Sequence, residues 1–278
     1  MTLITGHKGF IGSHLVENKL DYIGYDLKDG QDIRNKYQLA KIFANNNITQ
    51  IIHLAAEAGV RRGEKYPDEY ISTNINGTRN LLELAEEYGV KHFIFFSSSS
   101  VYGNQKPPFK EDMKLAPNSL YGLTKLAGEL LCKLSPVRTT VVRPFSVYGE
   151  NGRGDQVVYK WLNQVSLVEP VSFYGTGRTI RGYVYVKDLV DGVRAIFNDK
   201  CLRRNFEVYN LGGQEKITLD HLYGLFEEWF PRIEKKVFDL PNADVRENWA
   251  DISKAKLHLK WSPDTKFDNK IKELLWKM

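Results

Sequence analysis

Four tyrosines in this chain are each followed by a lysine four positions later, an arrangement that can create a general base. On a helix, residues four apart are neighbours, so the two side chains share one face. The lysine ammonium then stabilises the phenolate and lowers the pKa of the tyrosine, which can accept a proton near neutral pH. The four pairs are Tyr37/Lys41, Tyr102/Lys106, Tyr121/Lys125 and Tyr183/Lys187.

The sequence around each pair selects Tyr121 and Lys125. They open a predicted helix over residues 121–134, directly before a predicted strand, and they follow a serine run at residues 97–100. That run ends another predicted strand, and ligands of parallel sheets bind at the carboxyl ends of the strands. The other three pairs lie in an early helix, across a Gly-Asn-Gln turn and in a β-like alternation. We therefore expect the pair at 121 and 125 to carry chemistry.

A second pattern, Gly6-x-x-Gly9-x-x-Gly12, lies between the first predicted strand and its helix. A tight turn there brings backbone N–H groups at a helix N-terminus close to a pyrophosphate. Asp26 follows Gly6 by 20 residues and ends the second strand. A carboxylate at this position accepts hydrogen bonds from an adenosine ribose 2′-OH and repels a 2′-phosphate, so the pattern predicts NAD rather than NADP as cofactor.

The elements that must position these groups alternate along the first half of the chain. Strands are expected at residues 2–5, 22–25, 50–54, 92–96 and 139–142, and helices from residue 10 and at residues 34–46, 68–88 and 121–134. Short connections between alternating strands and helices predict an α/β fold of the Rossmann type, a doubly wound parallel sheet covered on both faces.

After about residue 145 the alternation loosens and Gly-rich turns separate short elements. We interpret this part as a smaller C-terminal α/β lobe that closes over a substrate. The expected division is an NAD-binding Rossmann domain at residues 1–145 plus about 183–212. The substrate lobe then takes about 146–182 plus 213–278.

Composition excludes several classes of protein. The 278 residues are 42% hydrophobic and 26% charged, typical of a globular chain, and the formal net charge is +5 with no dense basic block, so we expect no nucleic-acid partner. Two cysteines exclude a disulfide framework, and six histidines show no metal-ligand spacing. No apolar run approaches the roughly 20 residues of a membrane span, and the N-terminus lacks the pattern of a secretory leader. We expect a cytoplasmic protein without a metal or a membrane partner.

Ordered motifs along nearly the whole chain resemble the extended short-chain dehydrogenases/reductases of the NAD-dependent epimerase/dehydratase family, which act on nucleotide sugars. The resemblance is carried by residues 5–15, 53–56, 74–78, 97–103, 121–125, 143–149, 181–188, 209–212 and 249–255. One departure is the stretch from Asp26 to Asp32, which is shorter than the usual family loop and implies altered contacts to the adenosine.

The resemblance implies a role for each matching residue. Ser98 would hold the sugar hydroxyl that is oxidised, Tyr121 would be the general base, and Lys125 would activate it and bind a ribose. The implied cofactor-binding residues are Gly6, Gly9, Phe10, Ile11, Gly12, Asp26, Asp32, Ile33, Leu54, Ala55, Ala56, Asn74, Tyr121, Lys125, Pro144 and Phe145. The implied substrate-binding residues are Ser98, Ser99, Ser100, Ser146, Arg153, Arg181 and Arg246.

Family members share the oxidation of the sugar at C4 and differ in the fate of the 4-keto intermediate. A 4,6-dehydratase has an Asp-Glu pair directly after the serine or threonine, whereas Ser99 and Ser100 stand here and cannot transfer protons near neutral pH. The resemblance therefore favours an NAD-dependent 4-epimerase over a dehydratase. Two further alternatives stay open: a 4-keto-sugar reductase that uses NADPH, and a non-catalytic NAD-binding regulatory protein.

The expected substrate is a UDP-sugar. Ser98 to Ser100, Ser146, Arg153 and the segment at residues 58–61 resemble UDP-glucuronate 4-epimerases, in which an arginine and hydroxyls would anchor the sugar carboxylate. UDP-glucose/galactose and N-acetyl sugars remain alternatives.

The resemblance also implies a homodimer through the helices at about 72–88 and 121–134. Their apolar faces could equally pack inside the subunit, and they include Leu81, Leu84, Leu126 and Leu130.

Overall fold

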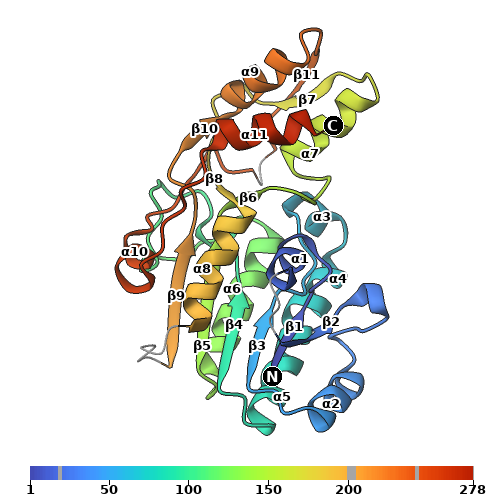
Figure 1. The fold of residues 1–278 in the computed structure, drawn as a ribbon, viewed down its shortest axis with the longest axis vertical. Helices are drawn as coiled ribbons and strands as arrows, with labels where there is room; N and C mark the ends of the chain where they lie inside the picture. The colour runs from blue at the N-terminus through green and yellow to red at the C-terminus, as the bar shows by residue number, and fades with distance from the viewer. Residues whose placement is uncertain (18–20, 199–204, 242–243, 278) are drawn as a thin grey trace.

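A computed structural model describes residues 1–17, 21–198, 205–241 and 244–277 of the chain. Its centre is a six-stranded, wholly parallel sheet with the strand order β2-β1-β3-β4-β5-β9 (Figure 1). The strands are β1 (Thr2–Thr5), β2 (Tyr22–Tyr25), β3 (Gln50–His53), β4 (His92–Phe96), β5 (Thr139–Pro144) and β9 (Phe206–Leu211). The predicted Rossmann-type fold is confirmed.

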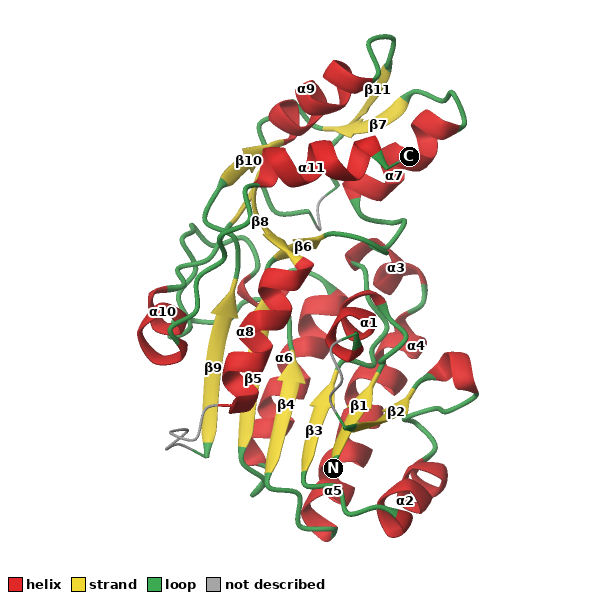
Figure 2. Cartoon of the chain, viewed as in Figure 1, coloured by secondary structure: helices red, strands yellow, loops and turns green. Residues whose placement is uncertain are grey.

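Helices cover both faces of this sheet (Figure 2). The helices on one face are α1 (Phe10–Val16) and α8 (Val186–Asn198), and those on the other are α2 (Lys36–Asn45), α5 (Thr78–Glu87) and α6 (Leu120–Leu134). Alternate strand residues supply the two cores, since Ile4 and Ile52 face the first layer while Leu3 and Ile51 face the second. Helical periodicity from Phe10 also predicts Asn18 on the inner face of this first helix, but Asn18 lies outside the described residues.

The helix expected at residues 68–88 contains a wide turn. It consists of α4 (Pro67–Ile71), a π-helical turn at Ser72–Gly77, and α5. The short helix α3 (Val60–Lys65) precedes it. A π-helical turn adds a residue to the helical repeat and is frequent at functional sites. Here it turns Asn74 inward, where the side chain is buried.

Most of the remaining elements lie beyond the carboxyl ends of the central strands, at the top of Figure 1. In one small sheet, β8 (Ile180–Tyr185) pairs with β6 (Ser146–Tyr148), β10 (Lys216–Thr218) and β12 (Glu247–Asn248). The other consists of β7 (Val171–Tyr174) and β11 (Lys235–Phe238). The helices are α7 (Val157–Ser166), α9 (Leu219–Trp229) and α11 (Phe267–Trp276), and α10 (Ser253–Leu259) packs beside β9. Residues 183–185, which we assigned to the Rossmann part, belong to β8 of the smaller sheet.

Two leucines expected at a dimer interface lie in the core instead. Leu81 and Leu84 of α5 are 0% and 1% exposed and pack in the core beneath the central sheet. For these two residues the alternative of packing inside the subunit is confirmed, because the apolar face of α5 is used there. Leu126 is partly buried, whereas Leu130 is 52% exposed.

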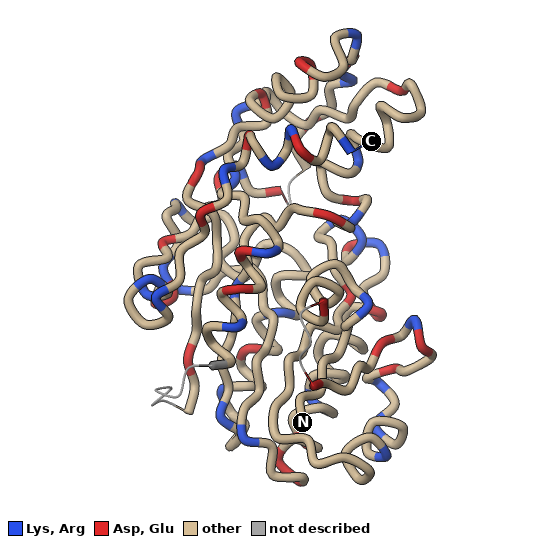
Figure 3. Tube along the Cα trace, viewed as in Figure 1, with Lys and Arg blue, Asp and Glu red and all other residues tan. Residues whose placement is uncertain are grey.

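Charged residues of both signs alternate along the trace (Figure 3). Within the described part of the chain, no helix has the length and apolar character needed to cross a membrane.

Candidate active site

A cavity of about 550 Å³ opens where the central strands end, between the parallel sheet and the smaller sheets. Most of the expected site residues line it: Gly6, Gly9, Phe10, Ile11, Gly12, Leu54, Ala56, Ser98, Ser99, Ser100, Tyr121, Lys125, Pro144, Phe145, Ser146 and Arg153. An adjoining cavity of about 220 Å³ shares some of these residues and adds Asp26, Asp32, Ile33 and Ala55. Residues distant in sequence therefore meet at the sheet edge where parallel-sheet proteins bind ligands.

The glycine turn after β1 has no room for larger side chains. Gly6 has a φ of +72°, and a Cβ there would lie 2.7 Å from the backbone nitrogen of Ala55. A Cβ at Gly12 would collide with the carbonyl oxygen of Gly6. The turn thus presents bare backbone and the first N–H groups of α1 to the cavity, which suits a pyrophosphate such as that of NAD.

Asp26 ends β2 at the wall of the smaller cavity and is buried. Its carboxylate accepts hydrogen bonds from the backbone N–H groups of Lys8 and Lys28, both at 2.9 Å. The short segment after it is a 3₁₀ turn at Leu27–Asp29, which ends at Gly30 with a φ of +73°. The carboxylate is therefore fixed in place at the position expected for a ribose hydroxyl.

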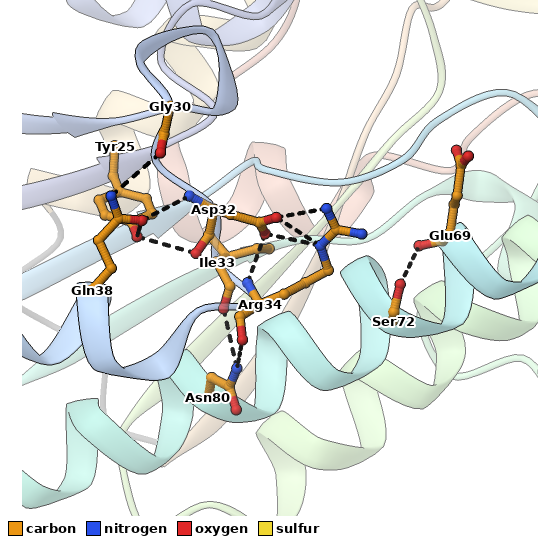
Figure 4. Close-up of polar contacts among 9 residues, drawn as sticks. All are labelled: Tyr25, Gly30, Asp32, Ile33, Arg34, Gln38, Glu69, Ser72 and Asn80. Carbon is orange, nitrogen blue, oxygen red and sulfur yellow. Dashed lines mark hydrogen bonds and ion pairs between the residues drawn. The ribbon is translucent and has the colours of Figure 1, made fainter.

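Asp32 and Ile33 line the same cavity, but the Asp32 carboxylate already has a partner (Figure 4). The Arg34 guanidinium binds it through Nε at 2.8 Å and Nη2 at 2.6 Å. These hydrogen bonds hold the pKa of Asp32 below its usual value. Tyr25 donates a hydrogen bond to the Asp32 carbonyl, and Asn80 donates to the carbonyls of Ile33 and Arg34. The segment at Asp32 and Ile33, where the resemblance implies contact with the adenine, is thus held by hydrogen bonds, with Arg34 at its edge.

Asn74, expected among the cofactor contacts, lines neither cavity. Its amide accepts a hydrogen bond from the Glu57 backbone N–H at 2.8 Å and donates to the Glu57 carbonyl at 3.0 Å. It also donates to Thr124 at 3.0 Å, and the Thr124 hydroxyl donates to the backbone carbonyl of Tyr121. Asn74 therefore joins the loop after β3 to the first turn of α6. Its place in the structure is that of a positioning residue.

Tyr121 and Lys125 lie in the first turns of α6, which Ser119 caps by accepting a hydrogen bond from the Gly122 N–H. The Lys125 ammonium donates to the Phe96 carbonyl at the end of β4, at 2.9 Å. It lies 5.9 Å from the centre of the Tyr121 ring. The helix thus carries both groups to the carboxyl end of the central strands.

The pKa values of this pair are set by burial and neighbouring charge. Burial lowers the pKa of Lys125 to about 8, so the ammonium is still protonated at neutral pH. Burial raises the pKa of Tyr121, while the charge of Arg153 and a hydrogen bond with Ser98 lower it. Positive charge near the hydroxyl favours the phenolate, the form that accepts a proton.

The serines form a short 3₁₀ turn at Ser99–Tyr102 after β4. The Ser98 hydroxyl donates to the Ser100 hydroxyl at 3.1 Å and accepts from the Ser100 backbone N–H. Asn248 of β12 donates to the Ser99 hydroxyl at 2.9 Å, which ties the smaller sheet to this turn. Three hydroxyls therefore face the cavity beside Tyr121.

The three expected arginines are in different places. Arg153 lines the main cavity. Arg181 lines a neighbouring cavity of about 200 Å³, and its guanidinium donates to the backbone carbonyls of Ile180, Val245 and Arg246. The side chain of Arg246 is exposed and lines none of these three cavities. The structure does not bring the side chain of Arg246 to the main cavity. Its backbone carbonyl accepts a hydrogen bond from Arg181, and its side chain extends into solvent.

The cavity also contains ion pairs that the sequence did not indicate. Arg61 binds Asp244 at 2.8 Å and lies 4.0 Å from the centre of the Tyr174 ring. Arg153 binds Asp155 through two hydrogen bonds. Arg61 was singled out only within the resemblance at residues 58–61. No local pattern identifies Asp244, which is 183 residues away along the chain.

Comparison with known proteins places the chain among nucleotide-sugar enzymes. A family model described as the NAD dependent epimerase/dehydratase family matches residues 2–212. A UDP-glucuronate 4-epimerase of Thermodesulfobacterium geofontis is 34% identical in an alignment of 305 positions that covers 97% of this chain and 93% of that protein. The similarity to this relative thus extends over nearly the whole chain.

Two solved structures are similar over almost the whole chain. The UDP-glucuronic acid 4-epimerase of Bacillus cereus, in complex with UDP-glucuronic acid and NAD, is 30% identical with a TM-score of 0.89 and 99% of both chains covered. The UDP-glucose 4-epimerase of Thermotoga maritima, with UDP-glucose, is 29% identical with a TM-score of 0.90, covering 99% of this chain and 97% of that one. The fold is therefore shared with UDP-sugar epimerases.

Proposed function

The chain belongs to the NAD-dependent epimerase/dehydratase family, and on that premise we propose that it is an NAD-dependent UDP-sugar 4-epimerase whose substrate is UDP-glucuronate. The observation that carries the proposal is the meeting of Ser98, Tyr121 and Lys125 with Arg153 in one cavity beside the glycine turn. Acid–base groups and an arginine for a carboxylate are the parts that this reaction needs.

In the proposed reaction, the Tyr121 phenolate accepts the proton of the sugar 4-OH, which Ser98 holds by a hydrogen bond. NAD accepts the hydride of C4 and returns it to the opposite face of the resulting 4-keto sugar. Tyr121 then gives its proton back to O4, so that protons and electrons balance over one cycle. The Lys125 ammonium stabilises the phenolate in the intervals when Tyr121 is deprotonated.

The other fates of a 4-keto sugar find less support. Dehydration needs further acid–base groups, and the positions after Ser98 are held by Ser99 and Ser100, which keep their protons near neutral pH. A reductase that prefers NADPH is disfavoured by the fixed carboxylate of Asp26. A non-catalytic role would not account for the presence of both Tyr121 and Lys125 in the cavity.

UDP-glucuronate is favoured over UDP-glucose because of charge. The guanidinium of Arg153 lines the same cavity as Tyr121 and lowers the pKa of its hydroxyl, which supports a role for Arg153 beside the sugar carbon that reacts. A carboxylate at C6 can form two charge-assisted hydrogen bonds with an arginine, whereas a hydroxyl forms weaker neutral ones.

The test is product analysis on purified protein. Incubation with UDP-glucuronate is expected to yield UDP-galacturonate, resolved by chromatography, without net accumulation of NADH. A panel of UDP-, dTDP- and GDP-sugars defines the specificity. Faster turnover of UDP-glucose than of UDP-glucuronate would overturn the substrate assignment, and consumption of NADPH with one equivalent of reduced sugar would support a reductase instead.

We also propose that two copies associate through α6. Its outer face exposes Leu123, Leu130 and Leu134 at helical spacing, an apolar stripe that a second copy would cover. Light scattering is expected to give twice the chain mass of 32.0 kDa, and Leu130→Glu is expected to shift the protein to monomer. Leu167→Glu, at an equally exposed leucine outside α6, is the matched control. A monomeric wild-type protein at micromolar concentration would contradict the proposed dimer.

The cytoplasmic location expected from the sequence stays a prediction.

A further inference from the structure

Arg153 is already paired with a carboxylate in the cavity. Its Nε donates to Oδ1 of Asp155 and its Nη2 donates to Oδ2, both at 2.9 Å. Both residues line the cavity, and the pair lies against Gly59 of the opposite wall, where a Cβ would be 2.9 Å from Asp155 Oδ2. Asp155 therefore occupies the Nε/Nη2 edge of the guanidinium, and a uronate bound at that edge would have to displace it.

A 4-epimerase that acts on a uronate must release that carboxylate in every cycle. The hydride leaves one face of C4 and returns to the other, so the sugar ring has to turn in the cavity between the two steps. The carboxylate is attached to C5, next to C4, and moves away from its anchor as the ring turns. The Arg153 and Asp155 side chains are 40% and 54% exposed, so an unpaired Arg153 is partly solvated, and the loss of its carboxylate partner opposes the turn by the modest free energy of an exposed ion pair.

We propose that Asp155 is a positioning residue that takes the place of the substrate carboxylate on Arg153 while the 4-keto sugar turns, an inference that rests on the proposed function. One carboxylate replaces another on the same two donors, so Arg153 is never unpaired during the turn. The same exchange weakens the binding of uronates, because Asp155 must be displaced each time the substrate carboxylate returns.

The backbone around the pair suits such an exchange. No described atom lies within 4 Å of the position of a Cβ at Gly154, the residue between Arg153 and Asp155. By contrast, the segment that leads to this pair is fixed at Glu150, because the Glu150 carbonyl is hydrogen-bonded to the His14 ring at 2.8 Å. Asp155 directly precedes the capping residue of α7, where a released carboxylate is favoured by the helix dipole.

The test is a steady-state comparison of Asp155→Asn with the wild-type protein on UDP-glucuronate. Asparagine offers one acceptor in place of two, and the loss of one charge-assisted hydrogen bond corresponds to about a 10-fold effect. We expect KM to fall about 10-fold and kcat to fall by a similar factor, because substrate and product hold Arg153 more tightly. Enzyme-bound NADH, followed by its absorbance, is expected to rise because the 4-keto sugar waits for the turn.

Two further variants make the outcome decisive. Asp191→Asn is the matched control, since Asp191 forms an exposed pair with Arg194 on α8, away from the cavity, and it is expected to leave KM and kcat unchanged. In an Arg153→Met background, Asp155→Asn is expected to have no further effect on KM. An unchanged or raised KM in Asp155→Asn would overturn the inference and indicate a structural role. Absence of epimerisation by the wild-type protein would instead overturn the proposed function.

Discussion

Tyr121→Phe is expected to lower kcat for the epimerisation of UDP-glucuronate by about 10³-fold, within the range of general acid–base catalysis. The substitution removes only the hydroxyl that accepts the proton of the 4-OH. The ring stays in place, because it packs edge-on against Tyr70 with 6.2 Å between the ring centres and forms part of the first turn of α6. The measurement is the rate of product formation under saturating substrate, followed by chromatography.

Tyr37→Phe is the matched control, because Tyr37 also precedes a lysine by four positions but is 73% exposed on α2. It is expected to leave kcat unchanged. Binding of NAD to Tyr121→Phe, measured by calorimetry, is expected to weaken less than about 10-fold, since one hydrogen bond is lost. Turnover of Tyr121→Phe near the wild-type rate would show that another group is the base.

Glu129→Ala is expected to lower the free energy of unfolding by about 3–5 kcal/mol, because it leaves the guanidinium of Arg143 buried without its counter-charge. The two side chains are 4% and 3% exposed. They are joined by hydrogen bonds of 2.9 Å and 2.7 Å, and the Ser97 hydroxyl donates to the same carboxylate. Urea unfolding, monitored by circular dichroism, gives the difference.

Glu83→Ala is the control for this substitution. Glu83 forms an exposed ion pair with Lys36 at 2.7 Å, and its loss is expected to cost less than about 1 kcal/mol. Replacement of both Glu129 and Arg143 by methionine is expected to cost less than Glu129→Ala alone, since no charge is left unpaired. Equal effects of Glu129→Ala and Glu83→Ala would mean that Arg143 finds another partner.

The buried pair also supports the site. Arg143 lies on β5 and its Nη1 donates to the Tyr102 hydroxyl at 2.8 Å, while Tyr102 donates to Asn210 at 2.7 Å. Ser97, which binds Glu129, directly precedes Ser98. These contacts hold the serine turn at the end of β4 in place. We therefore expect Glu129→Ala to lower kcat as well as the free energy of unfolding.

Local sequence patterns were sufficient for most of the fold. The alternation of short apolar runs with helical periodicity predicted the parallel sheet, because each element buries a face whose period is readable within roughly 10 to 15 residues. The glycine turn and Asp26 were placed correctly for the same reason, since strand, turn and helix are contiguous. The selection of Tyr121 and Lys125 among four pairs also depended only on neighbouring elements.

The assignments that needed long-range packing were the ones that changed. Leu81 and Leu84 belong to an amphipathic helix, but periodicity alone does not state whether an apolar face meets the subunit core or a second copy. Asn74 was expected among the cofactor contacts. Only the π-helical turn at residues 72–77 shows that its amide is hydrogen-bonded to Glu57 and Thr124. Arg246 is two residues from the site residue Asn248 yet lines none of the cavities.

By itself, then, the sequence determined the candidate groups for catalysis and cofactor binding: the tyrosine–lysine pair, the serine run, the glycine turn and Asp26, each encoded within one strand–helix unit. Only the tertiary structure decided which charges face one another across the cavity. Asp244 binds Arg61 of α3 across 183 residues of the chain. Such contacts join surfaces brought together by the whole fold and have no period along the chain, so no local pattern contains them.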